Sequence, residues 1–418
     1  MRKIQVPGFN LFVLFALANL LLLTACSKTP ETANQKPSLT VSLLTDGLKV
    51  TIKGKAVDPD GTISGGVIDW GDHSFTYPAA SEFAGFEISH FYASPDSCRI
   101  RVTVHDNAGD SIVQVIPVNV NFRETSLAGI KTTLFKTGGN EFLILTLNQH
   151  TYQESRQLEK LEMITGLIGK MNVDFVAFQE CAQANNTPIS NGIIRTDNMA
   201  LLITNRLKEK FNANYNFVWN WSHYGWNVWE EGVAVLSKFP VVASEDRYIS
   251  ASKSTGSITS RKVIYASCQA PGQLFNIFSA HTHWRISASD EEQNKEINNI
   301  KSMVSEKEMV NPDAVSFVCG DFNGNPTSDF PWSEGYNTMM KTGDYSDTFF
   351  DICPGANQKP AQSIYNTVGG DLPGRIDYIF MKKDSRLQVI DSQIIFTNDI
   401  VGTVSDHFGV LTKVAFTR

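Results

Sequence analysis

The sequence of 418 residues has few cysteines, no excess of basic residues and little long apolar sequence. Its six cysteines show neither close pairs nor the spacing of a metal site, so we expect no disulfide framework. Acidic residues outnumber basic ones by 43 to 36, which argues against the basic surface of a typical nucleic-acid-binding protein. The hydrophobic fraction of 42% nevertheless suffices for substantial cores, which excludes wholesale disorder.

The long apolar run lies near the N-terminus, from Phe9 to Leu23, and Asn19 interrupts it. A transmembrane helix needs about 20 apolar residues, so this run is typical of a signal peptide, which we place at residues 1–25.

The end of this run, Leu23-Thr24-Ala25-Cys26, resembles the lipobox of bacterial lipoproteins, in which the cysteine is lipidated and becomes the first mature residue. The resemblance implies a lipid at Cys26 that attaches the chain to a membrane of the bacterial cell envelope, on the periplasmic face of the outer membrane or at the cell surface. Residues 26–37 would then be a polar tether.

Short alternating apolar runs from Leu39 to Val120 are separated by turn signals and predict an all-β sandwich over residues 38–121. The segments Ala56-Val-Asp-Pro-Asp-Gly61 and Ile68-Asp-Trp-Gly-Asp72 resemble the PKD domain, an immunoglobulin-like module. Its acidic turns could bind calcium, but we interpret them as turns that their own short side chains satisfy. The resemblance implies a spacer, or an adhesive domain with a carbohydrate or protein ligand.

After a linker at residues 122–140, strands alternate with helices over residues 141–418, which indicates an α/β domain. We expect helices near Met199 to Phe211 and from Ser289, which has the capping-box spacing with Glu292.

Polar residues collect at the ends of the apolar strands of this domain. Taken singly, each is more often a cap, a turn residue or a hydrogen-bonded structural group, but a sheet presents its strand ends to a common site. They are Asn148, Glu180, His283, Asp321, Asn323, Asp377, Asp406 and His407.

The order and local sequence of these residues resemble the endonuclease/exonuclease/phosphatase superfamily. The matching motifs are Phe178-Gln-Glu180, Glu231-Gly-Val-Ala-Val-Leu-Ser237, Thr282-His283, Gly320-Asp-Phe-Asn323, Arg375-Ile-Asp-Tyr378 and Ser405-Asp-His407. The resemblance implies a DNase-I-like four-layer α/β sandwich, in which two packed β-sheets are flanked by helices and the active site lies at one edge.

The resemblance further implies a phosphoesterase that depends on Mg²⁺ or Mn²⁺. Asn148 and Glu180 offer the hard oxygen ligands that these ions prefer, and Asp406 would organise metal or water. Asp321 would orient or deprotonate the attacking water, while Asn323, two residues later on the same side, would hold the phosphate.

His407 and His283 would donate to the phosphate oxygens as negative charge develops. The resemblance implies that Asp377 orients His407. We assign Glu231 as the carboxylate that orients His283. His281 is the competing choice, but Thr282-His283-Trp284 fits the family motif better. His150 could also point into the site.

The segment from Tyr215 to Glu231 is rich in tryptophan and tyrosine, which either stack on a substrate or belong to the core. With Arg261-Lys262, this stretch is similar to a bacterial branch of sugar-phosphate phosphatases. We therefore name Tyr224 and Arg261 as substrate candidates, although a surface role for Arg261 is nearly as common.

These observations predict hydrolysis of a small organic phosphate or phosphodiester, such as a sugar phosphate or a lipid head group, by in-line attack of water. The first alternative is a secreted nuclease, because a bound metal ion could attract nucleic acid even though the net charge of the protein is negative. The second is a non-catalytic, carbohydrate-binding or adhesion lipoprotein. Such a protein would have no physical need for the complete set of polar groups.

Overall fold

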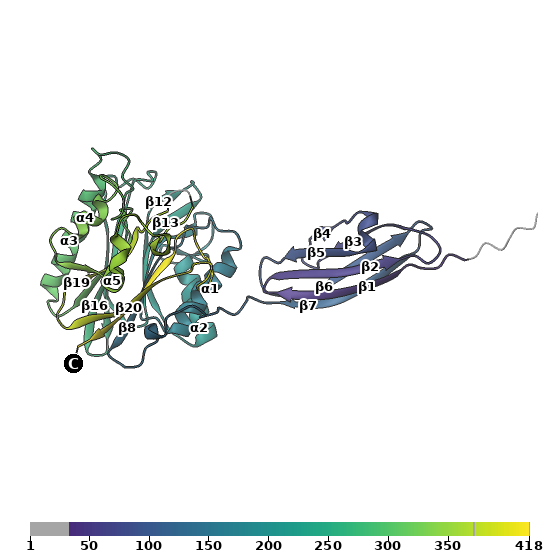
Figure 1. The fold of residues 1–418 in the computed structure, drawn as a ribbon, viewed down its shortest axis with the longest axis horizontal. Coiled ribbons are helices and arrows are strands. Elements are labelled where there is room, and N and C mark those ends of the chain that lie inside the picture. Colours follow the sequence, from purple (N-terminus) through teal and green to yellow (C-terminus); the bar gives the residue numbers. More distant parts are fainter. Residues whose placement is uncertain (1–32, 371–372, 418) are drawn as a thin grey trace, which may run out of the picture. The chain divides into compact units, whose positions relative to one another are not determined.

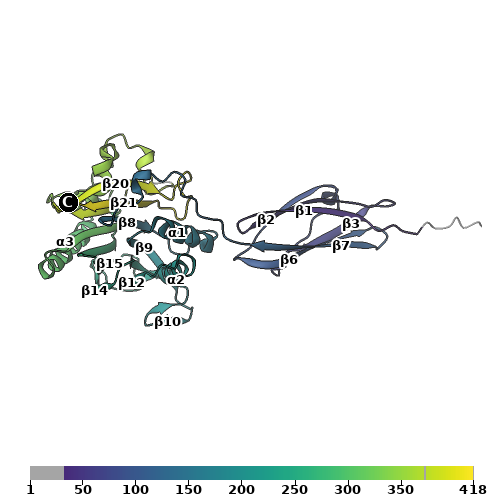
Figure 2. The ribbon, with the colours of Figure 1, turned by 90° about the horizontal axis from the view of Figure 1, so that it is seen from below.

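The computed structural model describes residues 33–370 and 373–417. The expected signal peptide and the expected lipid site at Cys26 lie outside these residues. The described chain forms two compact units, which we treat separately (Figures 1 and 2). In the described part, we find no helix that has both the length and the apolar character to span a membrane.

The N-terminal region is all-β and consists of two sheets, consistent with the expected immunoglobulin-like sandwich. One sheet has the order β1 (Ser38–Asp46), β2 (Lys49–Val57) and β5 (Phe86–Phe91); the other has the order β4 (Phe75–Thr76), β3 (Ile63–Asp69), β6 (Asp96–Asp106) and β7 (Ser111–Val120). Ile52, Ile68 and Phe83 are buried in this region. In the turn after β6, Asp106 accepts from the backbone N–H groups of Ala108 and Asp110, as in a self-satisfied acidic turn.

The second unit contains two six-stranded sheets. The first has the order β12 (Asn216–Gly225), β13 (Trp229–Ser237), β9 (Phe175–Ala184), β8 (Glu141–Asn148), β21 (Gly409–Phe416) and β20 (Leu387–Ile395). The second has the order β14 (Val241–Tyr248), β15 (Lys262–Ala270), β16 (Gln273–His281), β17 (Val315–Asp321), β19 (Asp377–Lys382) and β18 (Tyr345–Asp347). A separate small pair is formed by β10 (Ile189–Asn191) and β11 (Ile194–Arg195).

Helices cover the outer faces of both sheets, which makes four layers (Figure 1). α1 (Gln157–Met171) and α2 (Met199–Phe211) pack on the first sheet, and α3 (Glu292–Val310) and α4 (Glu334–Met340) pack on the second. A short α5 (Thr348–Ile352) follows β18. This architecture agrees with the expected DNase-I-like sandwich.

Alternation along the strands divides the apolar residues between the inner and outer faces of the sheets. In β8, Phe142 and Ile144 face the other sheet, whereas Leu143 and Leu145 face α1 and α2. Both faces are therefore buried, which explains why these strands are nearly continuous apolar runs.

Two of the expected helices illustrate how capping sets a boundary. α2 begins at Met199, as expected, because the side chain of Asn198 accepts from the backbone N–H of Leu201 at 3.1 Å. α3 begins at Glu292 and not at Ser289, so that expectation is wrong. Asp290 accepts from the backbone N–H of Glu292 at 3.1 Å and keeps the preceding residues in a turn.

Two parallel strand pairs bring four chain segments to one edge of the sandwich. β8 pairs with β9 and β16 pairs with β17, so the carboxyl ends of each pair lie together. Gly320, with φ of +150°, lies in β17 so close to β16 that a Cβ built on it would lie 1.9 Å from the carbonyl oxygen of Ala280. Only glycine allows this approach.

We expect Gly320→Ala to destabilise the fold by about 3 kcal/mol or more, because the added methyl group would push β16 and β17 apart. Thermal unfolding checks this, with Gly139→Ala as the control, since a Cβ at Gly139 meets open space. An unchanged melting temperature for Gly320→Ala would contradict this account of the strand contact.

Candidate active site

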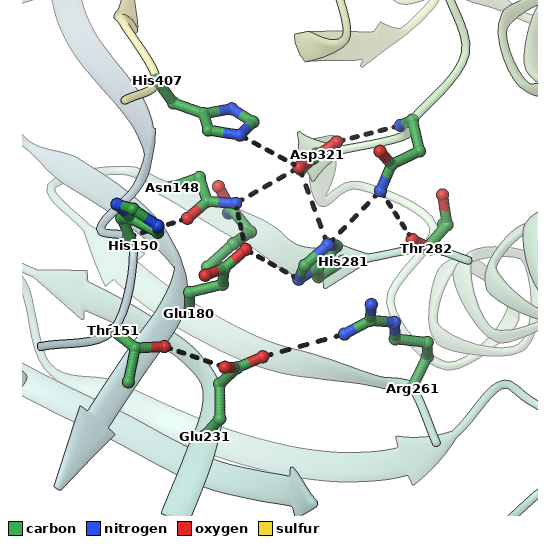
Figure 3. Close-up of polar contacts among 12 residues, drawn as sticks. Asn148, His150, Thr151, Glu180, Glu231, Arg261, His281, Thr282, Asp321 and His407 are labelled. Carbon is green, nitrogen blue, oxygen red and sulfur yellow. Dashed lines mark hydrogen bonds and ion pairs between the residues drawn. The ribbon is translucent and has the colours of Figure 1, made fainter. Parts of the chain in front are cut away.

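The inner faces of both sheets change from apolar to polar at the edge where the parallel strands end. Positions that continue the inward alternation of the core are occupied there by polar side chains (Figure 3). They are Asn148 on β8, Glu231 on β13, His281 on β16, Asp321 on β17 and Asp377 on β19, and all five are buried.

Glu180 joins this group through an irregularity in β9. Pairing with β13 shifts register between Gly232 and Ala234, which leaves an extra residue in β9 opposite them. Glu180 has φ of 45°, an unusual value for a residue other than glycine. This bulge accounts for a side chain that turns inward, although strict alternation from Phe178 would turn it toward the helices.

Asn148 connects the carboxylates of the two sheets. Its Nδ2 donates to Glu180 Oε1 at 2.9 Å and to Asp321 Oδ2 at 3.2 Å (Figure 3). Its Oδ1 accepts from the backbone N–H of His150 at 2.9 Å. We expected Asn148 to be a metal ligand, but in this arrangement its nitrogen, not its oxygen, faces the carboxylates.

Asp321 lies between the polar groups of several strands. Its Oδ2 is 3.6 Å from His281 Nε2 and 3.8 Å from His407 Nε2, and its Oδ1 accepts from the backbone N–H of Asn323 at 2.9 Å. Burial, together with the nearby Asp377 carboxylate, raises the pKa of Asp321 to about 6.

His407 is held by Asp377, the pairing that the family resemblance implies. Nδ1 of His407 is 2.9 Å from Asp377 Oδ2, and both side chains are buried. Burial opposes the charge of the imidazole, but the carboxylates of Asp377 and Asp321 outweigh it and raise the pKa of His407 to about 10.

The structure places His281, and not His283, in the site. His281 Nδ1 is 3.9 Å from Glu180 Oε1, and Asn323 Nδ2 is 3.4 Å from His281 Nε2. His283 instead lies 2.9 Å from Asp290 Oδ2 through its Nε2. Our preference for His283 is therefore corrected.

The physical reason is that β16 ends at His281. Pairing with β17 stops there, so strand alternation does not extend to His283. Beyond this point Glu296 accepts from the backbone N–H of His283 at 2.6 Å, and Gln293 donates to its carbonyl oxygen at 2.8 Å, so α3 holds this residue. Burial lowers the pKa of His281 well below its usual value, and Arg261 adds to this effect.

Glu231 does not orient His283, so that expectation is also wrong. Its Oε1 lies 3.2 Å from His223 Nε2 and 3.8 Å from Arg261 Nη1, and its Oε2 accepts from Thr151 at 2.8 Å. Burial opposes the charge of Glu231, yet His223 and Arg261 lower its pKa. His223 faces Glu231 because a bulge in β12 shifts the register just before it. The sequence contains no signal that predicts this shift.

Arg261, a substrate candidate, borders this group. It is buried, and its guanidinium lies 5.3 Å from the centre of the Trp284 ring. Its Nε has no hydrogen-bond partner in the described part of the chain. The Nε–H group of Arg261 can therefore donate a hydrogen bond to a ligand bound beside Glu231.

Two other candidates lie apart from Glu180 and Asp321. Asp406 is exposed, and its Oδ1 is 3.3 Å from His150 Nδ1, which in turn is 2.8 Å from Glu154 Oε1. Tyr224 pairs with Glu230, and its ring centre is 4.9 Å from that of Trp221. Because neighbouring strand residues face opposite ways, Tyr224 lies on the face opposite Glu231, which explains why the structure does not bring it into the group.

The donor atoms suit a divalent cation. Single ligand atoms of Glu180, Glu231 and His281 lie within 4.8 Å of one another, as do those of Asp321, Asp377 and His407. Burial raises the pKa of Glu180 to about 8, and the charge of Glu231 adds to this. A cation beside Glu180 would relieve this repulsion, and carboxylate oxygens are the ligands that Mg²⁺ and Mn²⁺ prefer.

A model described as the Endonuclease/Exonuclease/phosphatase family matches residues 152–407, more than half of the chain. The chain belongs to the endonuclease/exonuclease/phosphatase family. Members of this family are hydrolases of the nuclease and phosphatase type and generally depend on a divalent metal.

Three solved structures are similar to this chain. A family protein from Leptotrichia buccalis is 27% identical, with a TM-score of 0.56 over 66% of this chain and 100% of the other. One from Bacteroides thetaiotaomicron is 16% identical, with a TM-score of 0.48 over 66% and 95%. The human Nocturnin catalytic domain is 17% identical, with a TM-score of 0.48 over 66% and 95%. Among curated proteins, none matches.

We expect binding of Mg²⁺ to release a proton below pH 8, because Glu180 must lose its proton to become a ligand. Affinity should then rise by up to about tenfold per pH unit between pH 6 and 8 and level off above. Calorimetric titration in buffers of different ionisation enthalpy measures both quantities. Glu180→Gln should abolish the proton release, while Glu230→Gln, on the opposite face, should retain it. Equal affinities at pH 6 and 8 would contradict this.

We also expect the imidazole of His407 to be protonated at pH 8 and neutral in Asp377→Asn, because Asp377 contributes most among the three carboxylates, with Asp321 and Asp406, that raise its pKa. Because folding raises the pKa of His407, its ion pair with Asp377 stabilises the fold fully below pH 6.5. This stabilisation is lost as the pH rises through about 10. NMR of the imidazole nitrogens checks the charge state. A neutral ring at pH 8 in the unchanged protein would refute it.

Proposed function

We propose that this family member is a metal-dependent phosphoesterase that hydrolyses a small organic phosphate or phosphodiester by in-line attack of water. The observation that carries this proposal is the position of Asp321, a buried acid between His281 and His407 and in contact with Asn148. A carboxylate with a pKa of about 6 can accept a proton near neutral pH.

In this proposal, Asp321 orients the attacking water and accepts its proton. The charged imidazole of His407 donates to a non-bridging oxygen of the phosphate, and Asp377 keeps it charged and fixed. Asn323 lies two residues after Asp321, with its Nδ2 3.4 Å from His281 Nε2, and this amide holds the phosphate. His281, close to both Asp321 and Asn323, takes the place that we first assigned to His283.

Glu180 would hold the metal ion, with Glu231 and His281 within reach. When bound, the ion would neutralise charge on the phosphate and make the phosphorus more electrophilic. Arg261 adds a fixed positive charge beside this group, and its free Nε suits a phosphate oxygen.

The substrate class follows from charge. The whole chain carries a formal net charge of −7, so a long polyanion would gain little from the protein surface, whereas a single phosphate group meets the buried cations at the site. We therefore favour a sugar phosphate or a lipid head group over nucleic acid. We further propose that the N-terminal sandwich is a PKD-like spacer and that a lipid at Cys26 attaches the protein to the bacterial cell envelope.

The test is hydrolysis across a panel of sugar phosphates, phosphocholine lipids, nucleotides and DNA, with Mg²⁺ and with a chelator. We expect metal-dependent turnover of one class of small substrate. Asp321→Asn and His407→Ala should each lower turnover about 10²-fold to 10⁴-fold without unfolding the domain. Cys319→Ser, a buried neighbour on β17, is the matched control and should mainly affect packing.

Turnover of DNA alone would move the assignment to a nuclease. No turnover on the whole panel, with Asp321→Asn indistinguishable from the unchanged protein, would overturn catalysis and favour a binding role.

A further inference from the structure

Three loops follow the strands that carry the site and lie at the same edge. They are residues 226–228 between β12 and β13, residues 282–291 after β16, and residues 322–333 after β17. We call them the catalytic-edge loops. His281 and Asp321 directly precede the second and third, and Glu231 lies just after the first.

Each catalytic-edge loop turns two large apolar side chains toward solvent. The exposed fractions are 58% for Trp226, 43% for Val228, 38% for Trp284, 68% for Ile286, 65% for Phe330 and 47% for Trp332. Single exposed apolar residues are normal on a soluble protein, but here each of three loops beside one site carries a pair of them.

The loop after β16 exposes apolar side chains and buries a charged one, whereas a loop that faces water ordinarily does the reverse. Between the exposed Trp284 and Ile286 lies Arg285, which is only 7% exposed. None of its guanidinium nitrogens has a hydrogen-bond partner in the described part of the chain, and its ion pair with Glu291 is long, 3.7 Å. Arginine normally keeps its charge in water, so a loop that buries it and exposes isoleucine is suited to an apolar partner.

The composition of the loops selects among apolar partners. Arg285 is the only lysine or arginine in them, and it is buried, whereas Glu291 and Asp329 are exposed. Lys359, from outside the loops, lies 2.7 Å from Asp329 Oδ1 and so only balances that charge. Nucleic acid and strongly anionic membranes would therefore gain little electrostatic attraction here. Isoleucine, valine and phenylalanine offer sugars no hydrogen bond, but together with tryptophan they are the side chains that enter the boundary between water and lipid.

We propose that the catalytic-edge loops seat the site on a surface of zwitterionic phospholipid, so that the phosphate ester hydrolysed is the head group of a lipid. This inference rests on the proposed function and names its substrate class. Water adds across one P–O ester bond of the diester, which gives a phosphate monoester and an alcohol. The apolar side chains hold the acyl region while the diester reaches Asp321.

The test uses residues 27–418, which retain every described residue and exclude both the apolar N-terminal run and Cys26. Ile286→Ser with Phe330→Ser removes two exposed side chains that we place outside the catalytic group. The matched control is Met309→Ser with Val310→Ser, which are 75% and 73% exposed at the end of α3, near the start of β17 and so at the opposite edge.

We expect the unchanged protein to sediment with phosphatidylcholine vesicles. The Ile286/Phe330 variant should partition at least about tenfold less and hydrolyse vesicular lipid about tenfold more slowly, while the control variant should match the unchanged protein. All three should hydrolyse the soluble diester bis(p-nitrophenyl) phosphate at equal rates.

Absence of binding to phosphatidylcholine, binding only to anionic vesicles, or equal losses in both variants would overturn the inference. So would self-association of the unchanged protein that the Ile286/Phe330 substitutions abolish, because a second copy would then be the partner. Failure of the proposed function is distinguishable, since the unchanged protein would then hydrolyse neither the soluble diester nor the soluble monoester p-nitrophenyl phosphate, even if it binds vesicles.

Discussion

The site depends on one buried amide that joins the two sheets. Asn148, at the end of β8, donates to Glu180 in its own sheet and to Asp321 in the other. A buried carboxylate without partners is costly, so these two hydrogen bonds both stabilise the acids and fix the distance between them. The relative position of the acid and the candidate metal ligand is thus set where the sheets meet.

Most of the charged side chains around Asn148 have a neighbour of opposite charge. Asp377 keeps His407 charged, and His223 with Arg261 keeps Glu231 charged. Glu180 has no such cation in hydrogen-bonding contact among the described residues, and burial raises its pKa to about 8. The unbalanced charge therefore lies where a divalent cation would serve, which is a local electrostatic argument for the metal position.

The sequence could predict the fold class and many of the site residues, because strict alternation tells which side chains of a regular strand face the interior of the sandwich. Asp321, Asp377 and Asn148 continue the inward pattern of their strands, and each reaches the group. His281 and His283 share the same alternation, but only the end of pairing at His281 decides between them, and that depends on β17. The bulges that turn Glu180 and His223 inward, and leave Tyr224 outward, are likewise properties of pairing between distant segments.

The distances between the acidic residues of the site and the side chains exposed around the site depend on different parts of the structure. The inner residues of the strands that carry the site form the core between the sheets. Phe142, Phe175 and Phe275 lie near the starts of β8, β9 and β16, at the opposite ends of these strands from the site, and their ring centres are 4.6 to 6.4 Å apart. Their packing sets the separation of the sheets. Any change in that separation would move Asp321 relative to Glu180, so the geometry of the acids is a property of packing. The exposed positions of the catalytic-edge loops contribute nothing to this core, unlike the buried Phe322 and the site residue Asn323 at the start of the third loop. These exposed positions can present apolar or charged side chains to a substrate without altering the distances on which the chemistry depends.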